Sequence, residues 1–173
     1  MNLREEILKE HSRRQALKIA GWIGNDRKKF SRLLDLFLHD EYRVVQRSAM
    51  VLGYVADNHS ELIEQNIQVI VKRLDDNNIH IAVTRNVVRL LQFVQIPKKL
   101  HAQVINICFN YLSDPNETVA VRCFSMTVLT NFTKQYPEIK NELEAVIKTV
   151  LKDVKGGLKV RARDALKELN KIR

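Results

Sequence analysis

Histidine and cysteine are the residue types in this sequence best suited to chemistry, because they bind metals and take part in nucleophilic and redox steps. No histidine stands four residues from another, the spacing that would place two metal ligands on one helical face. Cys108 and Cys123 lie among apolar neighbours, without the second pair that a zinc site needs. We expect both to pack in the core, and we predict no metal, no cofactor and no enzymatic activity.

Composition describes an ordinary folded protein with a strong positive charge. The 173 residues are 45% hydrophobic and 28% charged, with 29 Lys and Arg against 20 Asp and Glu, a net charge of +9. Five glycines and three prolines argue against a turn-rich all-β fold. The apolar runs are too short for a membrane span or a signal peptide. We therefore expect a cytoplasmic protein with no membrane association.

Apolar residues recur at spacings of three and four, which predicts amphipathic helices rather than strands. The clearest stretches are 30–38, 62–74, 100–112 and 143–151, and a short first helix is expected around 3–9. Other helices, smaller and more uniformly apolar, lie between these stretches. Asp114-Pro115-Asn116-Glu117 has the residues of a helix start, with an aspartate cap, a first-turn proline and a glutamate that reaches back.

An arginine recurs in the second helix of each expected pair, at Arg14, Arg47, Arg85, Arg122 and Arg163. Its separations of 33, 38, 37 and 41 residues match the period of stacked helix pairs. The sequence therefore predicts an all-α protein, an α-α superhelix of about five helix pairs. We expect these pairs to form one repeat domain over residues 1–173.

Two of the segments that open the second helices resemble the HEAT-repeat family, namely Asp40…Val44…Ala49…Leu52-Gly53 and Asp114-Pro115-Asn116…Val119. The arginine stands three residues after the valine here, whereas HEAT repeats usually place it directly after the valine. The resemblance implies a right-handed solenoid whose second helices line a concave surface. It also implies a binding scaffold, without indicating the partner.

The second helices would then present a mixed basic and apolar strip. Three basic pairs at i and i+4 are Arg14/Lys18, Arg85/Arg89 and Arg163/Lys167, and such pairs repel each other modestly unless an anion lies between them. Val88 and Leu129 are expected among the apolar members. The other candidate partner-binding residues are Arg43, Arg47, Met50, Tyr54, Gln92, Arg122 and Lys159.

Two interpretations of the arginines remain open. They either face a ligand or hold neighbouring repeats together by bonding to loop carboxylates and helix ends. The basic run in 121–173, which carries +6, is either a binding surface or a polar end cap.

Function is open in the same way. A protein partner on the concave surface is the leading prediction, and nucleic acid is the alternative, because basic charge attracts phosphates without specificity. A distant similarity to HEAT-like alkylpurine DNA glycosylases extends to architecture only. Such an enzyme needs a groove carboxylate beside aromatic residues, and Asp57 near Tyr54 is the one candidate.

Overall fold

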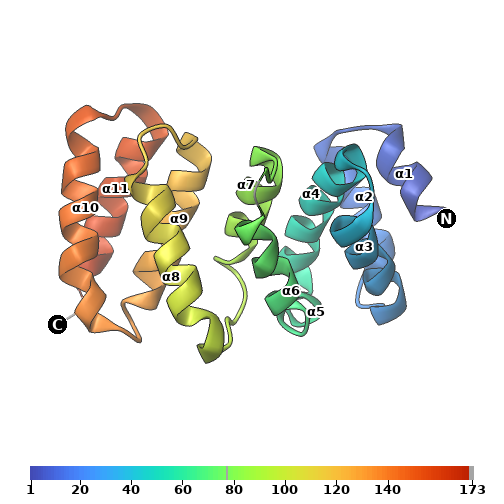
Figure 1. Ribbon diagram of the computed structural model, residues 1–173, viewed down its shortest axis with the longest axis horizontal. Helices are drawn as coiled ribbons and strands as arrows, with labels where there is room; N and C mark the ends of the chain where they lie inside the picture. The colour runs from blue at the N-terminus through green and yellow to red at the C-terminus, as the bar shows by residue number, and fades with distance from the viewer. Residues whose placement is uncertain (77, 172–173) are drawn as a thin grey trace. The chain divides into compact units, whose positions relative to one another are not determined.

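The structure is a computed structural model that describes residues 1–76 and 78–171. Its described residues are helical, with short turns between the helices and no strand. They confirm the expected all-α architecture of five helix pairs (Figure 1). The chain divides into two compact units, unit 1 (Met1–Ile96) and unit 2 (Pro97–Arg173).

Unit 1 contains three helix pairs. The first pairs α1 (Leu3–Lys9) with α2 (Arg13–Ile23), and the second pairs α3 (Arg27–His39) with α4 (Tyr42–Asn58). In the third, α5 (Ser60–Glu64), α6 (Ile67–Lys72) and the 3-10 turn η1 (Arg73–Asp75) precede α7 (Ile81–Leu90). The second helices α2, α4 and α7 pack side by side, and α4 also contacts α1 and α3 (Figure 1).

Unit 2 contains the other two pairs. The fourth pairs α8 (Lys98–Ser113) with α9 (Val119–Phe132). In the fifth, a 3-10 turn, η2 (Pro137–Ile139), leads into α10 (Lys140–Asp153), which pairs with α11 (Gly156–Leu169). The second helix α9 contacts both α8 and α11, so it occupies the centre of this unit (Figure 1).

The cores follow from helical periodicity. In α4, Val44, Leu52 and Val55 are almost fully buried, while Arg47 and Tyr54, on another side of the helix, are half-buried. Burying such side chains is the main stabilising contribution in folding, and each contributes about 1.5–3 kcal/mol relative to exposure. Gly24 ends α2 with a φ of +50°, a conformation that residues with a Cβ rarely adopt.

The boundaries of the helices confirm some predictions and correct others. The short first helix lies over the expected residues 3–9, whereas the expected helix over 62–74 is divided at Asn66 into α5, α6 and η1. The predicted helix start at Asp114 is wrong. Asp114 instead forms a turn by accepting a hydrogen bond from the Asn116 amide, and α9 begins at Val119, with Thr118 as its cap.

Candidate functional site

The solvent-facing side chains of α2, α4 and α7 form one surface of unit 1, here called the second-helix face. Because these helices pack side by side, their exposed positions lie on adjoining strips. The face includes most residues that the sequence nominated in this part of the chain, together with Leu17: Arg14, Leu17, Lys18, Arg43, Arg47, Met50, Tyr54, Arg85 and Arg89.

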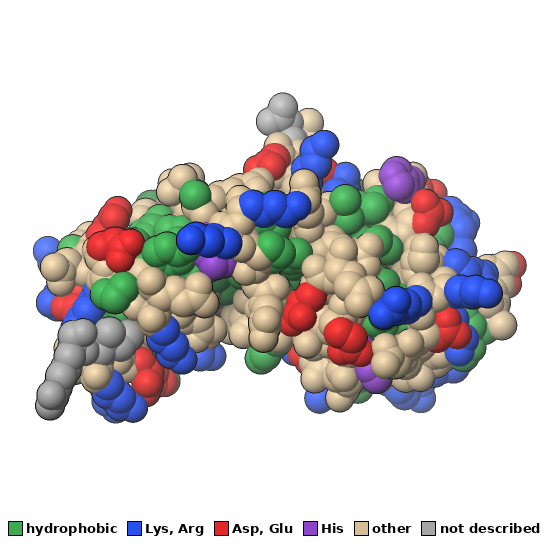
Figure 2. All heavy atoms as spheres, turned by 90° about the horizontal axis from the view of Figure 1, so that it is seen from below, with side chains coloured by type: hydrophobic (Ala, Val, Ile, Leu, Met, Phe, Trp, Pro, Cys, Tyr) green, Lys and Arg blue, Asp and Glu red, His purple; other side chains and the backbone are tan. Residues whose placement is uncertain are grey.

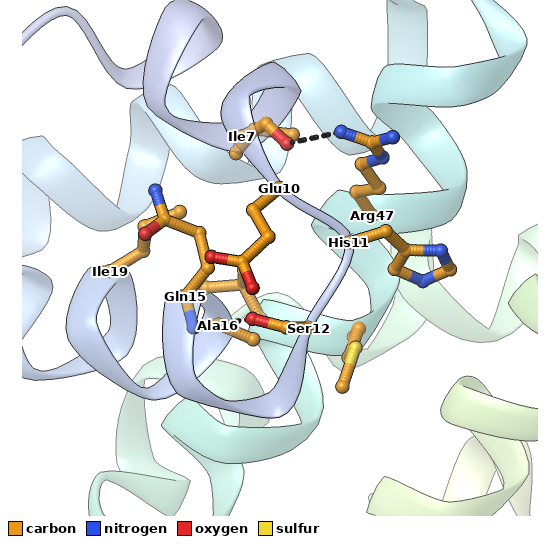
Figure 3. Close-up of a pocket in the computed structure, with 10 residues that line it drawn as sticks. Ile7, Glu10, His11, Ser12, Gln15, Ala16, Ile19 and Arg47 are labelled. Atoms are coloured by element: carbon orange, nitrogen blue, oxygen red, sulfur yellow. Dashed lines mark hydrogen bonds between the residues drawn. The ribbon is translucent and has the colours of Figure 1, made fainter.

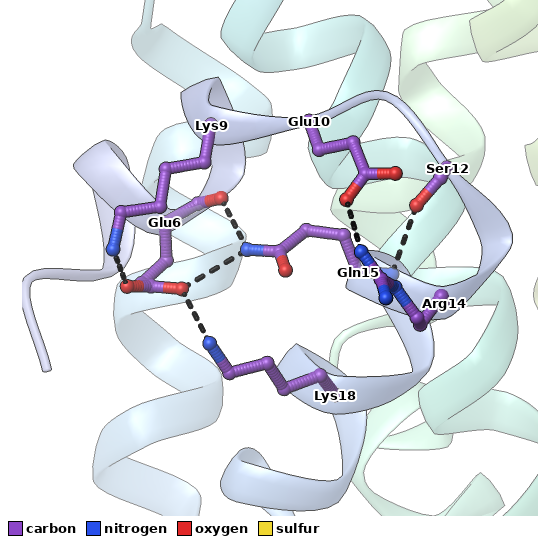
Figure 4. Close-up of polar contacts among 7 residues, drawn as sticks. All are labelled: Glu6, Lys9, Glu10, Ser12, Arg14, Gln15 and Lys18. Carbon is purple, nitrogen blue, oxygen red and sulfur yellow. Dashed lines mark hydrogen bonds and ion pairs between the residues drawn. The ribbon is translucent and has the colours of Figure 1, made fainter.

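Two cations of α2 are neutralised by carboxylates of the first pair (Figure 4). Arg14 lies 3.3 Å from Glu10, and Lys18 lies 3.0 Å from Glu6. Glu6 is buried and also accepts hydrogen bonds from Lys9 and from the Gln15 amide. The bonds from Lys9, Lys18 and Gln15 lower the pKa of Glu6 to about 2, because they favour its ionised form. The first basic pair therefore has its counter-ions within the unit.

Arg47 reaches from α4 to the end of α1 (Figure 3). Its Nη1 donates to the carbonyl oxygens of Ile7 and Leu8, at 3.1 and 2.8 Å. These carbonyls lie in the last turn of α1, where no helical amide is left to pair with them. The cavity beside Arg47 has a volume of about 10 Å³, room for about one water molecule. Arg47 thus links the first and second helix pairs.

Arg89 connects α7 to α4 through three kinds of contact. It donates to the Gly53 carbonyl at 3.0 Å and pairs with both oxygens of Asp57, at 3.1 and 2.9 Å. Its guanidinium also lies 5.6 Å from the Tyr54 ring centre and 5.4 Å from that of Phe93. The carboxylate and aromatic residues required for glycosylase chemistry are thus engaged by one arginine.

The remaining nominated residues of unit 1 differ in exposure. Arg43 and Arg85 are exposed and make no ion pair with the residues that the structure describes. Gln92 donates to the Arg89 carbonyl at 2.9 Å, and Met50 is half-buried beside the Arg47 cavity.

The nominated residues of unit 2 divide into one buried and three more accessible side chains. Arg122 is 8% exposed, and its Nε donates to the Leu112 carbonyl in the last turn of α8, at 3.1 Å. Arg163 and Lys167 are exposed, Lys159 is half-buried, and none of the three forms an ion pair within the described part of unit 2. The five recurring arginines therefore have different environments.

A groove between α9 and α11 was not anticipated from the sequence. It has a volume of about 370 Å³, and Thr127, Lys134, Arg161, Asp164 and Glu168 are among its lining residues. The Lys171 ammonium, 2.6 Å from Glu168, lowers the pKa of that carboxyl. The spacing of Asp164 and Glu168 at i and i+4 was the available signal, but it does not reveal which neighbouring helix those carboxylates approach.

Several expectations about buried residues need correction. Val88 and Leu129 are fully buried and so do not belong to an exposed strip. His101, expected at a surface or a helix end, is 7% exposed and lies 2.7 Å from the Tyr136 hydroxyl. Cys108 is buried as expected, and burial raises the pKa of its thiol to about 12, whereas Cys123, also expected in the core, is half-buried.

Figure 2 shows Lys and Arg side chains interspersed with Asp and Glu over the displayed faces of both units. The positive charge is unequal, since residues 1–96 carry a net +3 and residues 97–173 a net +6. The described residues contain no group of three or more His, Cys, Asp or Glu that could hold a metal ion. None of the helices described is both long and apolar enough to cross a membrane.

The fold and the contacts between pairs define an α-helical repeat protein, in which second helices such as α4 and α9 contact both their own first helix and a neighbouring pair. A family model for the HEAT repeat domain matches residues 3–169, and the chain therefore belongs to the HEAT-repeat family. No curated protein matches the sequence. HEAT repeats commonly act as scaffolds that mediate protein interactions.

Proposed function

We propose that this HEAT-repeat protein is a non-enzymatic scaffold that binds another protein through the second-helix face of unit 1. The proposal rests on one contrast: most cations on this face already have partners within the unit, whereas its apolar side chains are accessible to solvent. Arg14, Lys18 and Arg89 already have carboxylate partners, and Arg47 is engaged by backbone carbonyls. Cations that are already paired attract a phosphate backbone less strongly than unpaired cations do.

The same face also has apolar side chains that remain partly or largely accessible to a partner. Leu17 is 42% exposed, and Met50 and Tyr54 are half-buried between their helices and solvent. Interfaces between proteins typically place apolar and aromatic anchors at the centre and charged residues at the rim. Arg43 and Arg85, which have no ion-pair partner among the described residues, supply positive charge near those anchors. The partner that fits is a protein segment with apolar side chains flanked by carboxylates.

A pair of matched double variants tests the proposal. Leu17→Ser with Arg85→Ser removes one exposed apolar side chain and one unpaired cation from the second-helix face. Val69→Ser with Arg32→Ser is the control, because Val69 of α6 is 41% exposed and Arg32 of α3 is exposed on a first helix. Both variants change charge equally and are expected to fold, since they alter surface positions.

The measurement is quantitative capture from nuclease-treated extract of the cells that make the protein, followed by affinity determination with the purified partner. We expect a protein that binds wild type and control alike and loses at least tenfold in affinity for the face variant. Equal affinity for both variants would place the binding surface elsewhere. A protein that is captured from untreated extract but not from nuclease-treated extract would favour the nucleic-acid alternative.

A further inference from the structure

The helix α11 and its N-cap residue, Lys155, carry a regular series of cations that the proposed scaffold function does not use. Lys155, Lys159, Arg163 and Lys167 recur at every fourth residue, and we call these four residues the α11 cation ladder. Four residues advance about 6 Å along a helix, so the ladder extends over about 18 Å. Lys155, Arg163 and Lys167 are exposed and Lys159 is half-buried.

The ladder has no counter-ions among the described residues. The acids on the same helix, Asp164 and Glu168, instead line the groove toward α9, and Glu168 pairs with Lys171. Like charges at i and i+4 repel each other and destabilise a helix. Cations in the first turn also oppose the helix dipole, and α11 has no acidic residue there. Charge repeated in this way suits an external partner with repeated anions.

We propose that the α11 cation ladder binds the phosphate backbone of a nucleic acid without sequence preference. A nucleic-acid strand presents evenly repeated phosphates, and Lys and Arg neutralise them by displacing counter-ions. The ladder offers three cations on α11 and one at its N-cap, in a unit whose net charge is +6. This inference is independent of the protein-binding face, which lies in unit 1.

A membrane surface fits α11 less well. A helix that binds in the plane of a bilayer inserts its apolar side among the lipid chains. Four apolar side chains of α11, Leu158, Ala162, Ala165 and Leu169, are buried within unit 2, where the helix contacts α9 and α10. Leu166 is half-buried, and Val160 is 59% exposed. The described part of the helix therefore offers cations to a phosphate surface, but one exposed valine is too little apolar surface to insert into a bilayer.

The test measures fluorescence anisotropy of labelled mixed-sequence duplex and single-stranded oligonucleotides, titrated with the full chain between about 50 and 200 mM salt. The ladder variant is Arg163→Gln with Lys167→Gln. The control is Arg27→Gln with Lys28→Gln, which removes the same charge from exposed positions on α3 in unit 1. Comparing them separates a local contact from the effect of total charge.

We expect wild type and control to bind with similar affinity at low salt and the ladder variant to bind at least tenfold more weakly. Loss of two phosphate contacts should reduce the slope of log affinity against log salt by about 1.8 for duplex DNA. Equal weakening in both variants, or no binding at about 50 mM salt, would overturn the proposal.

Two further probes distinguish phosphate recognition in a nucleic acid from other polyanions. Polyglutamate is used as a competitor, and vesicles of phosphatidylserine and phosphatidylcholine are tested by sedimentation. We expect neither to match the oligonucleotide at equal charge concentration. If polyglutamate competes as well as DNA, the ladder binds acidic protein instead. If the vesicles bind equally and with the same dependence on Arg163 and Lys167, the nucleic-acid assignment is wrong.

Discussion

Arg89 of α7 and Asp57 of α4 form a two-point ion pair between neighbouring repeats, with Nη2 3.1 Å from one carboxylate oxygen and 2.9 Å from the other. Both side chains are less than a third exposed, at 27% and 29%. The same guanidinium caps the Gly53 carbonyl and lies against the rings of Tyr54 and Phe93. One side chain thus joins the second and third helix pairs through charge, hydrogen bonding and ring contact.

Replacing Arg89 with methionine should destabilise unit 1. The change keeps much of the apolar stem but removes the ion pair and the bond to Gly53, which together contribute about 1–2 kcal/mol. Urea unfolding followed by the fluorescence of Trp22, the sole tryptophan, measures unit 1 directly. Arg85→Met is the control, because Arg85 is exposed and unpaired among described residues, and should change stability by less than about 0.5 kcal/mol. Equal losses in the two variants would contradict the assigned role of Arg89.

In unit 2, substitution of Arg122 should loosen the end of α8. Arg122→Met leaves the Leu112 carbonyl without its donor in a buried position, at a cost of about 1–3 kcal/mol. Thermal unfolding by circular dichroism gives the loss of stability, and hydrogen exchange in peptides covering 105–113 locates it. Arg163→Met, at the equivalent but exposed position on α11, should leave both measurements nearly unchanged. Faster amide exchange confined to other parts of unit 2 would show that the hydrogen bond from Arg122 does not hold the end of α8.

The contribution of Glu6 should depend on pH. Its pKa in the folded protein is lowered to about 2, so its interactions stabilise the fold above the unfolded-state value of about 4.3 and are lost as pH falls toward 2. Glu6→Gln should therefore lower the urea midpoint most at neutral pH. Its difference from wild type should shrink between about pH 4.5 and 2.

Trp22 fluorescence across pH 7 to 2.5 provides the measurement for Glu6. Glu5→Gln is the control, since Glu5 is exposed on the same helix. Subtracting each variant from wild type at every pH removes the contributions of the other carboxylates. A Glu6→Gln difference that stayed constant across this range would show that the carboxylate charge contributes nothing to stability.

Periodicity in the sequence was sufficient to predict the helix pairs, because burial requires apolar residues at fixed helical intervals. It located α1 over 3–9 despite the shortness of that helix. It did not locate the start of α9, because Asp114 satisfies a turn amide as readily as a helical one. Because a turn and a helix cap at Asp114 use hydrogen bonds of nearly equal stability, tertiary packing decides where the helix begins.

The recurring arginine was visible in the sequence, but its partners were not. Arg47 and Arg122 bond to carbonyls at helix ends, and a carbonyl is present at every residue, so no residue type marks those acceptors. Arg4 and Arg73, rather than the recurring arginines, pair with the loop carboxylates Asp40 and Asp76. The arginine thus recurs at a similar position in each second helix, while the groups around it determine what it contacts.

Gly53 supplies a sharper test of the contact with Arg89. Glycine inside a helix costs about 1 kcal/mol relative to alanine, so Gly53→Ala should stabilise a helix considered alone. A Cβ at this position would lie 3.1 Å from Nη1 of Arg89, and the guanidinium would have to move by a few tenths of an ångström. That movement disturbs the bonds to the Gly53 carbonyl and Asp57. We therefore expect Gly53→Ala alone to be neutral or destabilising.

A double-mutant cycle separates the two effects. In an Arg89→Met background the guanidinium is absent, and Gly53→Ala should then recover its helical gain of about 1 kcal/mol. The cycle is measured by urea unfolding with Trp22 fluorescence in wild type, both single variants and the double variant. A gain of the same size in both backgrounds would mean that Arg89 adapts without loss, and that glycine at position 53 is not required by its approach.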